Sequence, residues 1–217
     1  MRATVFTLHA SAPEKRKLQK VVEIIRRGGV VLYPSDTGFA LGCELSNKGA
    51  IQRIRAIRRL DESKLLTFLC ASLSRLSEFA LVENDAYKIV RRLVPGPFTF
   101  VLNATKNVPR YAQDPKRRTS GIRVPDDSIS QLLLEQLEAP LISITAKDAE
   151  GRYIDDPDDL VESFAGQVDA AITLDRYSFV GESTVIDLTG SAPQILRRGA
   201  GFDRVSEFIE LALDSVA

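Results

Sequence analysis

The stretch V-V-L-Y-P-S-D-T-G-F-A-L-G-C at residues 30–43 decides the fold. A short apolar run at Val30–Tyr33 enters a polar turn at 34–38, and a second apolar segment follows at Phe39–Cys43. Apolar runs of this length between Pro, Gly, Ser and Asp are typical of buried strands. Hydroxyl groups and a carboxylate at the end of a strand are well placed to contact a polar ligand. The alternative is an ordinary turn built on Pro, Asp and Gly.

Helices and strands intermix on both sides of this stretch. Apolar residues recur at helical spacing from Leu18 to Ile25, and Asn47 is a candidate cap for the next helix. The patterns predict helices at 48–59, 73–79, 84–93, 128–137, 156–164 and 203–213, and further strands at 3–10, 65–70, 98–103, 141–145, 170–174, 183–188 and 194–196. Because no steady βαβ alternation runs through them, we expect a twisted mixed α/β sheet flanked by helices.

Length and composition narrow the class of protein. At 217 residues the chain fits one domain, with 44% apolar and 27% charged residues. No stretch approaches the roughly 18 apolar residues of a membrane span, and the N-terminus lacks a signal-peptide pattern. Cys43 and Cys70 lie in apolar stretches without metal-ligand spacing. We therefore expect a single domain over 1–217, cytoplasmic, with no membrane partner and no metal held by protein ligands.

The sequence also excludes common active sites. His9 is the only histidine, and it lies within an alternating segment that predicts the first strand, so a Ser-His-Asp or Cys-His mechanism is not expected. Neither G-x-x-x-x-G-K-[ST] nor G-x-G-x-x-G occurs. Any nucleotide must then be held by arginines, hydroxyls and backbone amides.

Charge is distributed unevenly along the chain. Residues 1–125 contain 23 Lys+Arg and 10 Asp+Glu, whereas residues 126–217 contain 6 and 19. Two basic runs comprise Arg53, Arg55, Arg58, Arg59 and Lys64, and then Lys106, Arg110, Lys116, Arg117, Arg118 and Arg123. They indicate one positively charged face for a nucleotide or RNA. The alternative is a set of surface charges that pair with the acidic half of the folded chain.

An arginine in an apolar context forms another candidate site. Arg123 lies in G-I-R-V-P at 121–125, and its burial is costly unless it meets an anion, either an internal Asp or a substrate carboxylate. Small hydroxyl residues or arginines also end the predicted strands near residues 143–147, 181–187 and 196–199. Each of these signals is weak by itself.

Taken in order, the segments resemble the YrdC-like superfamily of threonylcarbamoyl-AMP synthases and their relatives. The matching segments are Y-P-S-D-T-G-F-A-L-G-C (33–43), the basic helix end (53–66), P-G-P-F-T-F-V-L (95–102), G-I-R-V-P (121–125), P-L-I-S-I-T-A (140–146), G-E-S-T-V-I-D-L (181–188) and I-L-R-R-G (195–199). They span about residues 18–200. The segments R-I-R-A-I-R-R-L (53–60), L-L-T-F-L-C (65–70), A-T-K-N-V-P-R (104–110) and 116–125 are similar to the YciO branch in particular.

The resemblance implies a twisted sheet with a concave, positively charged cavity. It also implies a reaction in which L-threonine, bicarbonate and ATP, with Mg²⁺ on the nucleotide, form threonylcarbamoyl-AMP for tRNA modification. Ser35 and Thr37 would lie at the threonine and carbamate end, and Arg58 and Lys64 would face phosphates or the carboxylate. The remaining cavity residues implied by the resemblance are Arg123, Ser143, Thr145, Ser183 and Arg197.

Two positions depart from the synthase pattern. The synthases carry K-x-R-P where this chain has Arg58-Arg59-Leu60-Asp61, and S-x-N where it has Thr145-Ala146-Lys147. Lys147 either replaces the amide as a phosphate clamp or indicates a different substrate. Three functions remain open: a synthase, a double-stranded RNA- or tRNA-binding protein of the same fold, and a nucleotide-binding relic with a regulatory role. For RNA the candidate contacts are Arg53, Arg55, Arg59, Lys106, Arg110, Lys116, Arg117 and Arg118.

Overall fold

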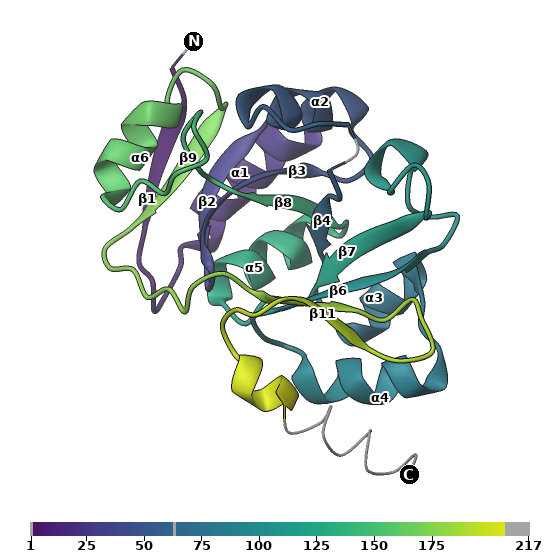
Figure 1. The fold of residues 1–217 in the computed structure, drawn as a ribbon. Coiled ribbons are helices and arrows are strands. Elements are labelled where there is room, and N and C mark those ends of the chain that lie inside the picture. Colours follow the sequence, from purple (N-terminus) through teal and green to yellow (C-terminus); the bar gives the residue numbers. More distant parts are fainter. Residues whose placement is uncertain (1, 63, 207–217) are drawn as a thin grey trace.

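A computed structural model describes residues 2–62 and 64–206, and its strands form one twisted sheet (Figure 1). Along the sheet the strand order is β1-β9-β2-β3-β8-β4-β7-β6-β10-β11, and β5 pairs with β6 off this path. The strands are β1 (Thr4–Leu8), β2 (Val31–Ser35), β3 (Gly38–Glu44), β4 (Thr67–Leu69), β5 (Ala80–Leu81), β6 (Phe98–Ala104), β7 (Thr119–Arg123), β8 (Leu141–Thr145), β9 (Ala170–Leu174), β10 (Thr184–Asp187) and β11 (Gln194–Arg197). The helices are α1 (Lys15–Arg26), α2 (Lys48–Ile57), α3 (Leu73–Phe79), α4 (Asn84–Leu93), the 3₁₀ helix η1 (Arg110–Ala112), α5 (Ser128–Leu137) and α6 (Pro157–Phe164).

The sheet is mixed, as the sequence predicts. β1 and β2 both pair in parallel with β9, β4 pairs in parallel with β7, and β6 pairs in parallel with β10. The other pairs are antiparallel, including the hairpin of β2 and β3 and the pairing of β8 with both β3 and β4. The prediction of a mixed α/β fold is therefore confirmed.

Helices cover both faces of the sheet. α1 and α5 pack on one face, where their apolar stripes meet Val31 and Tyr33 of β2. α2, α3, α4 and α6 contribute to the second core, which contains Leu32 of the same strand. The alternation of Val31, Leu32 and Tyr33 between two cores follows from the two-residue period of a strand. All three are fully buried, so this strand is apolar on both sides.

Several element bounds match the predictions and a few differ. α3, α4, α5, β8 and β9 have the predicted bounds, whereas no sequence pattern predicts β5 or η1. The predicted helix at 48–59 ends at Ile57, and the backbone of Arg59 turns to a φ of 48°. The predicted final helix starts at 202 and is helical to 206, and its remainder up to Leu213 lies outside the described residues. Among the described residues, no helix is both long and apolar enough to cross a membrane.

The strands in the middle of the sheet create the floor of the cavity described below. Thr67 of β4 lies directly opposite Gly121 of β7, and a Cβ at Gly121 would be 2.7 Å from the Thr67 hydroxyl oxygen. The same Cβ would be 3.3 Å from a methyl carbon of Thr99. Only glycine allows these two threonines to approach the strand this closely. Both threonine side chains line the cavity.

Candidate substrate-binding cavity

A cavity of about 620 Å³ lies between the tip of the β2–β3 hairpin and the ends of β7, β8, β10 and β11. All ten residues predicted to bind or act on substrate line it: Ser35, Thr37, Arg58, Lys64, Arg123, Ser143, Thr145, Lys147, Ser183 and Arg197. Apolar side chains, including Leu60 and Ile144, complete the lining. The sequence segments that are far apart in the chain therefore meet at one site.

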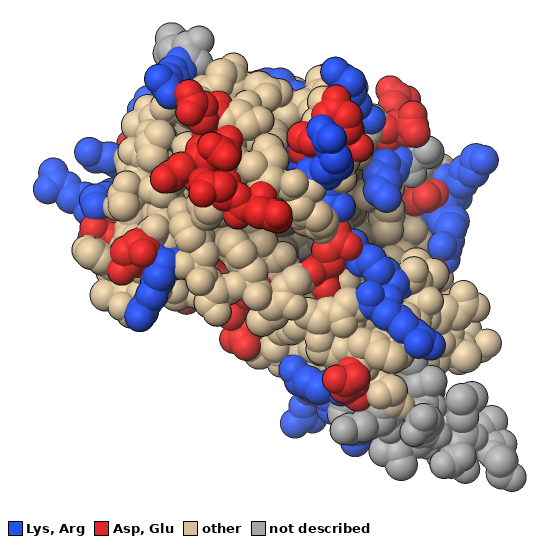
Figure 2. Space-filling view, turned by 60° about the vertical axis from the view of Figure 1, so that its left-hand side comes forward, with Lys and Arg blue, Asp and Glu red and all other residues tan. Residues whose placement is uncertain are grey.

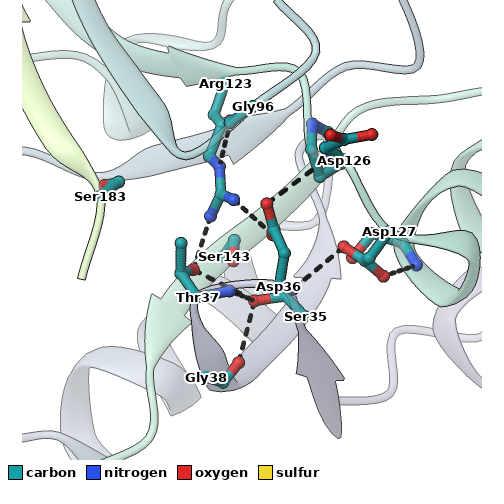
Figure 3. Close-up of polar contacts among 12 residues, drawn as sticks. Ser35, Asp36, Thr37, Gly38, Gly96, Arg123, Asp126, Asp127, Ser143 and Ser183 are labelled. Atoms are coloured by element: carbon teal, nitrogen blue, oxygen red, sulfur yellow. Dashed lines mark hydrogen bonds and ion pairs between the residues drawn. The ribbon is translucent and has the colours of Figure 1, made fainter. Parts of the chain in front are cut away.

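Arg123 is the buried cation of this cavity. It ends β7 and is only 4% exposed. Its guanidinium donates to the Thr37 hydroxyl at 2.6 Å, to the Asp36 carboxylate and to the Gly96 carbonyl oxygen at 3.2 Å (Figure 3). The anion expected beside Arg123 is thus the internal Asp36 in this structure. Because Asp36 neutralises the charge, Arg123 is held rigidly and orients Thr37 at the cavity wall.

The hairpin tip is also fastened to α5. The Asp127 carboxylate accepts from the Ser130 amide at 2.7 Å as the helix cap, and from the Asp36 amide at 3.2 Å (Figure 3). The amide of Asp126 donates to Asp36 at 3.4 Å. Burial, and next the negative charge of Asp36, raise the pKa of Asp127 to about 6. Two carboxylates close together thus join the turn at 34–38 to the start of a helix.

Two cavity hydroxyls accept hydrogen bonds from donors behind the wall. The Tyr33 hydroxyl, fully buried, lies 2.8 Å from the Ser143 oxygen and donates to it. Thr37 accepts from Arg123 in the same way. Since each oxygen already accepts a hydrogen bond from the protein, each hydroxyl can donate its own hydrogen, to an acceptor in the cavity or, for Thr37, to the Ser35 oxygen 3.2 Å away. Burial raises the pKa of Tyr33, so this phenol remains a donor. Such a wall favours anionic or carbonyl oxygens.

Arg58, Lys64 and Leu60 come from the chain that follows α2. Arg58 donates from Nε to the Thr145 carbonyl oxygen at 2.9 Å and from Nη1 to the Lys147 carbonyl oxygen at 3.0 Å. Burial lowers the pKa of Arg58. Arg58 therefore ties the end of α2 to the chain after β8 while lining the cavity. Leu60 places an apolar side chain where the synthase pattern has a second cation.

The two remaining cations of the cavity, Lys147 and Arg197, both pair with the carboxylate of Glu182. Lys147 Nζ lies 3.2 Å from Glu182 Oε1, and Arg197 Nη1 lies 3.2 Å from Glu182 Oε2. Arg197 also donates to the Ser183 hydroxyl at 3.0 Å, which is 2.8 Å from that of Thr99. Lys147 therefore lines the cavity and pairs there with Glu182, and its role as a phosphate clamp or as the mark of a different substrate stays a prediction.

The basic residues do not form the single concave face that the charge distribution suggests. None of the eight RNA-contact candidates lines the cavity. Arg53 pairs with Asp169 at 2.8 Å and Arg117 pairs with Asp187 at 2.8 Å. For these two residues the alternative is correct: surface charges of the basic half of the chain pair with the acidic half. In Figure 2 basic and acidic side chains are interspersed over one face.

The remaining RNA-contact candidates lie in two places outside the cavity lining. Arg55 donates to two backbone carbonyl oxygens of the chain that follows α2, and Arg59 is exposed beside it. The loop between β6 and β7 holds the other four, all with exposed side chains: Lys106, Arg110, Lys116 and Arg118. η1 lies within this loop, and the hydroxyl of Tyr111 donates to the Ser46 carbonyl oxygen. The loop is therefore anchored next to the start of α2.

Sequence patterns do not single out three side chains that belong to the polar networks around the cavity. They are the carboxylate of Asp127, the carboxylate of Glu182 and the phenol of Tyr153, which donates to Glu182. For Asp127 a signal exists, because Asp before a helical run is a common cap. Tyr153 lies in an irregular segment that gives no such signal. Within 2–62 and 64–206, no three His, Cys, Asp or Glu side chains lie close enough together to hold a metal ion.

A mixed sheet flanked by helices, with a cavity lined by arginines, lysines and hydroxyls and without a glycine-rich phosphate loop, defines the class of this α/β protein. The chain belongs to the Sua5/YciO/YrdC family, because the family model described as "Telomere recombination" matches residues 23–199. The predicted resemblance, including its YciO branch, is confirmed by the relatives.

Relatives and solved structures agree on this placement. The Escherichia coli K12 protein YciO is 39% identical over 199 residues, which cover 90% of this chain and 95% of that protein. Its crystal structure has a TM-score of 0.84 at 38% identity and covers 91% of this chain and 96% of that one. The Pyrococcus abyssi threonylcarbamoyl-AMP synthase is 29% identical over 187 residues, 86% of this chain and 55% of that protein. The crystal structure of P. abyssi Sua5 complexed with L-threonine has a TM-score of 0.83 at 28% identity, covering 91% of this chain and 58% of that chain.

Proposed function

We propose that this protein forms threonylcarbamoyl-adenylate from L-threonine, bicarbonate and ATP. The observation that carries the proposal is the convergence of all ten predicted residues on one cavity, with Arg123 and the hydroxyls at one wall and Lys147 and Arg197 at another. The similarity to a Sua5 structure in complex with L-threonine supports an amino acid as one substrate.

The proposed reaction needs charge stabilisation more than proton transfer. Threonine and bicarbonate lose water to form a carbamate, whose carboxylate oxygen attacks the α-phosphorus of ATP. The bond from that phosphorus to the bridging oxygen breaks, and pyrophosphate leaves with the electron pair. Ser35 and Thr37 would orient the carbamate, while Arg58, Lys64, Lys147 and Arg197 would stabilise phosphate charge.

Mg²⁺ would enter this cavity as part of the nucleotide. The carboxylate in the cavity lining, Glu182, is already shared between two cations. The donor set of the protein therefore fits an ion carried on phosphate oxygens better than one held by protein ligands. Its chemistry would be to neutralise charge on the leaving pyrophosphate.

Two substitutions test the proposal. The parent protein, Lys147→Asn, Leu60→Arg and the double variant are compared for pyrophosphate release that depends on both ATP and L-threonine. Restoring both synthase residues together should raise the rate, because Leu60→Arg adds a cation where Lys147→Asn removes one. The two effects should be non-additive because both residues would contact one substrate. Lys88→Asn on α4 and Leu81→Arg on β5, both exposed, are matched controls. No release from any variant, together with no ATP binding by calorimetry, would overturn the proposal.

A second function has support from one observation. The exposed residues Lys106, Arg110, Lys116 and Arg118 share the β6–β7 loop, which suits phosphate contacts to a double-stranded RNA or tRNA. Binding should weaken steeply with salt and show little preference for sequence. Charge reversal at Lys116 and Arg118 should then reduce RNA affinity and leave pyrophosphate release unchanged. Binding that is insensitive to salt would contradict this second function.

A further inference from the structure

Glu182 holds a network of three side chains from separate parts of the chain. Its Oε1 accepts from the Tyr153 hydroxyl and lies 3.2 Å from Lys147 Nζ, and its Oε2 lies 3.2 Å from Arg197 Nη1. Lys147 also lies 4.1 Å from the centre of the Tyr153 ring. Lys147 follows β8, Tyr153 belongs to the irregular segment before α6, and Arg197 ends β11. One carboxylate thus links three separate segments of the chain at the edge of the cavity.

The arrangement around Glu182 matches what a bound phosphate would need. Two cations and a hydroxyl donor surround two negatively charged oxygens, and the Ser183 hydroxyl is adjacent on Arg197. Charge-assisted contacts of this kind are the usual means by which proteins hold phosphate. The network therefore has the donors of an anion site, and in this structure the Glu182 carboxylate fills it.

The Glu182 carboxylate that fills this site is ionised. Burial by itself would raise the pKa of Glu182, but the Tyr153 hydrogen bond and the charges of Arg197 and Lys147 outweigh it, and the pKa is lowered. A negative charge therefore remains in the cavity at neutral pH. It repels a phosphate group that approaches the same two cations.

The same carboxylate can leave its position without disturbing the buried core. The Glu182 side chain is 33% exposed, and the preceding Gly181 has a φ of 90° and open space within 4 Å of the position that a Cβ would take. Tyr153 is 49% exposed. Asp36, by contrast, is buried against Arg123 and the Asp126 amide and cannot turn outward without breaking that network. Of these two carboxylates, only Glu182 is placed to be displaced.

We infer that Glu182 is a specificity-determining residue: its carboxylate occupies a phosphate subsite formed by Lys147 and Arg197, and an anionic ligand binds there only by displacing it. The inference rests on the proposed function in one respect, since it takes the ligand to be a phosphate ester such as a nucleoside monophosphate. Phosphate ligands then bind this chain more weakly than its number of cavity cations would indicate. Ligands without phosphate do not compete with Glu182.

Calorimetric titration of the full chain with AMP and with inorganic pyrophosphate tests this inference. Glu182→Gln keeps the shape and a hydrogen-bond acceptor but removes the charge, and should tighten binding of both probes by about tenfold, equivalent to about 1.4 kcal/mol. L-threonine binding should not change. Glu83→Gln, an exposed residue before α4, is the matched control for net charge and should bind like the parent. Lys147→Asn combined with Glu182→Gln should lose most of the gain.

A second variant guards against a folding defect in Glu182→Gln. Tyr153→Phe removes one hydrogen bond from the carboxylate without changing any charge, and should tighten AMP binding by a smaller factor. Equal or weaker AMP binding in both variants, with thermal unfolding like the parent, would overturn the inference, as would an absence of binding in all proteins. Tighter AMP binding without any pyrophosphate release would uphold the inference and count against the synthase reaction.

Discussion

Replacing Arg123 with methionine should destabilise the protein strongly. Met fills part of the same volume but has no guanidinium, so Asp36 is left buried without its cation. The hydrogen bonds to Thr37 and the Gly96 carbonyl oxygen are lost as well. Removing one partner of a buried ion pair costs about 3–5 kcal/mol. Each kcal/mol lowers Tm by about 2–4 °C in a domain of this size, so Tm should fall by roughly 6–20 °C.

The assay is urea unfolding combined with a double-mutant cycle. Asp36→Asn and the double variant are measured beside Arg123→Met, and the double variant should lose clearly less than the sum of the two single losses. Arg110→Met, at an exposed arginine of the β6–β7 loop, should change the unfolding free energy by less than about 0.5 kcal/mol. A loss below about 1 kcal/mol in Arg123→Met, or strictly additive effects, would refute the role of this ion pair.

Three further predictions concern other parts of the structure. Because the pKa of Asp127 is raised from 3.8 to about 6, stability contributed by its protonated form is lost as pH rises through this interval. The parent should therefore lose about 1–3 kcal/mol relative to Asp127→Asn between these pH values, and parallel urea-derived curves would contradict this. Gly199→Ala would put a Cβ 2.2 Å from a backbone oxygen and should lower the free energy of unfolding by about 1–3 kcal/mol. Gly49→Ala within α2 should instead raise it by up to about 1 kcal/mol. Equal Tm values for the two variants would refute this difference. Tyr33→Phe and Ser143→Ala should each cost about 1 kcal/mol but show a positive coupling in a double-mutant cycle, because they share one hydrogen bond.

Local signals explain which elements the sequence predicts well. α5 has apolar residues at helical spacing and Asp127 as its cap, so its bounds follow from neighbouring residues alone. β5 has two residues and exists because Ala80 and Leu81 pair with β6, which no local pattern reveals. The order of strands is likewise a matter of pairing between distant segments. Motifs therefore predict elements more accurately than their arrangement.

For the site, too, the sequence predicts which residues take part more accurately than how they pair. The ten lining residues belong to motifs that resemble a family, so the sequence alone is enough to place them in one cavity. The pairing of Glu182 with Lys147 is beyond such reasoning, because it depends on how the irregular segment before α6 folds against β10 and β11. The charge distribution along the chain is misleading for Arg53 and Arg117, whose acidic partners lie 116 and 70 residues away in sequence.

The pairing of β1 with β9 has a consequence for synthesis of the protein. Thr7 lies beside Thr173, 166 positions later in the chain, and β1 has no other neighbour in the sheet that the described residues form. At about 5–20 residues per second, a ribosome needs on the order of 10–30 s to make that partner. During this time β1 has no strand to pair with, so it joins the sheet only after most of the chain has been translated. Ribosome-bound chains that stop before residue 170 should accordingly be cleaved by protease within or next to β1.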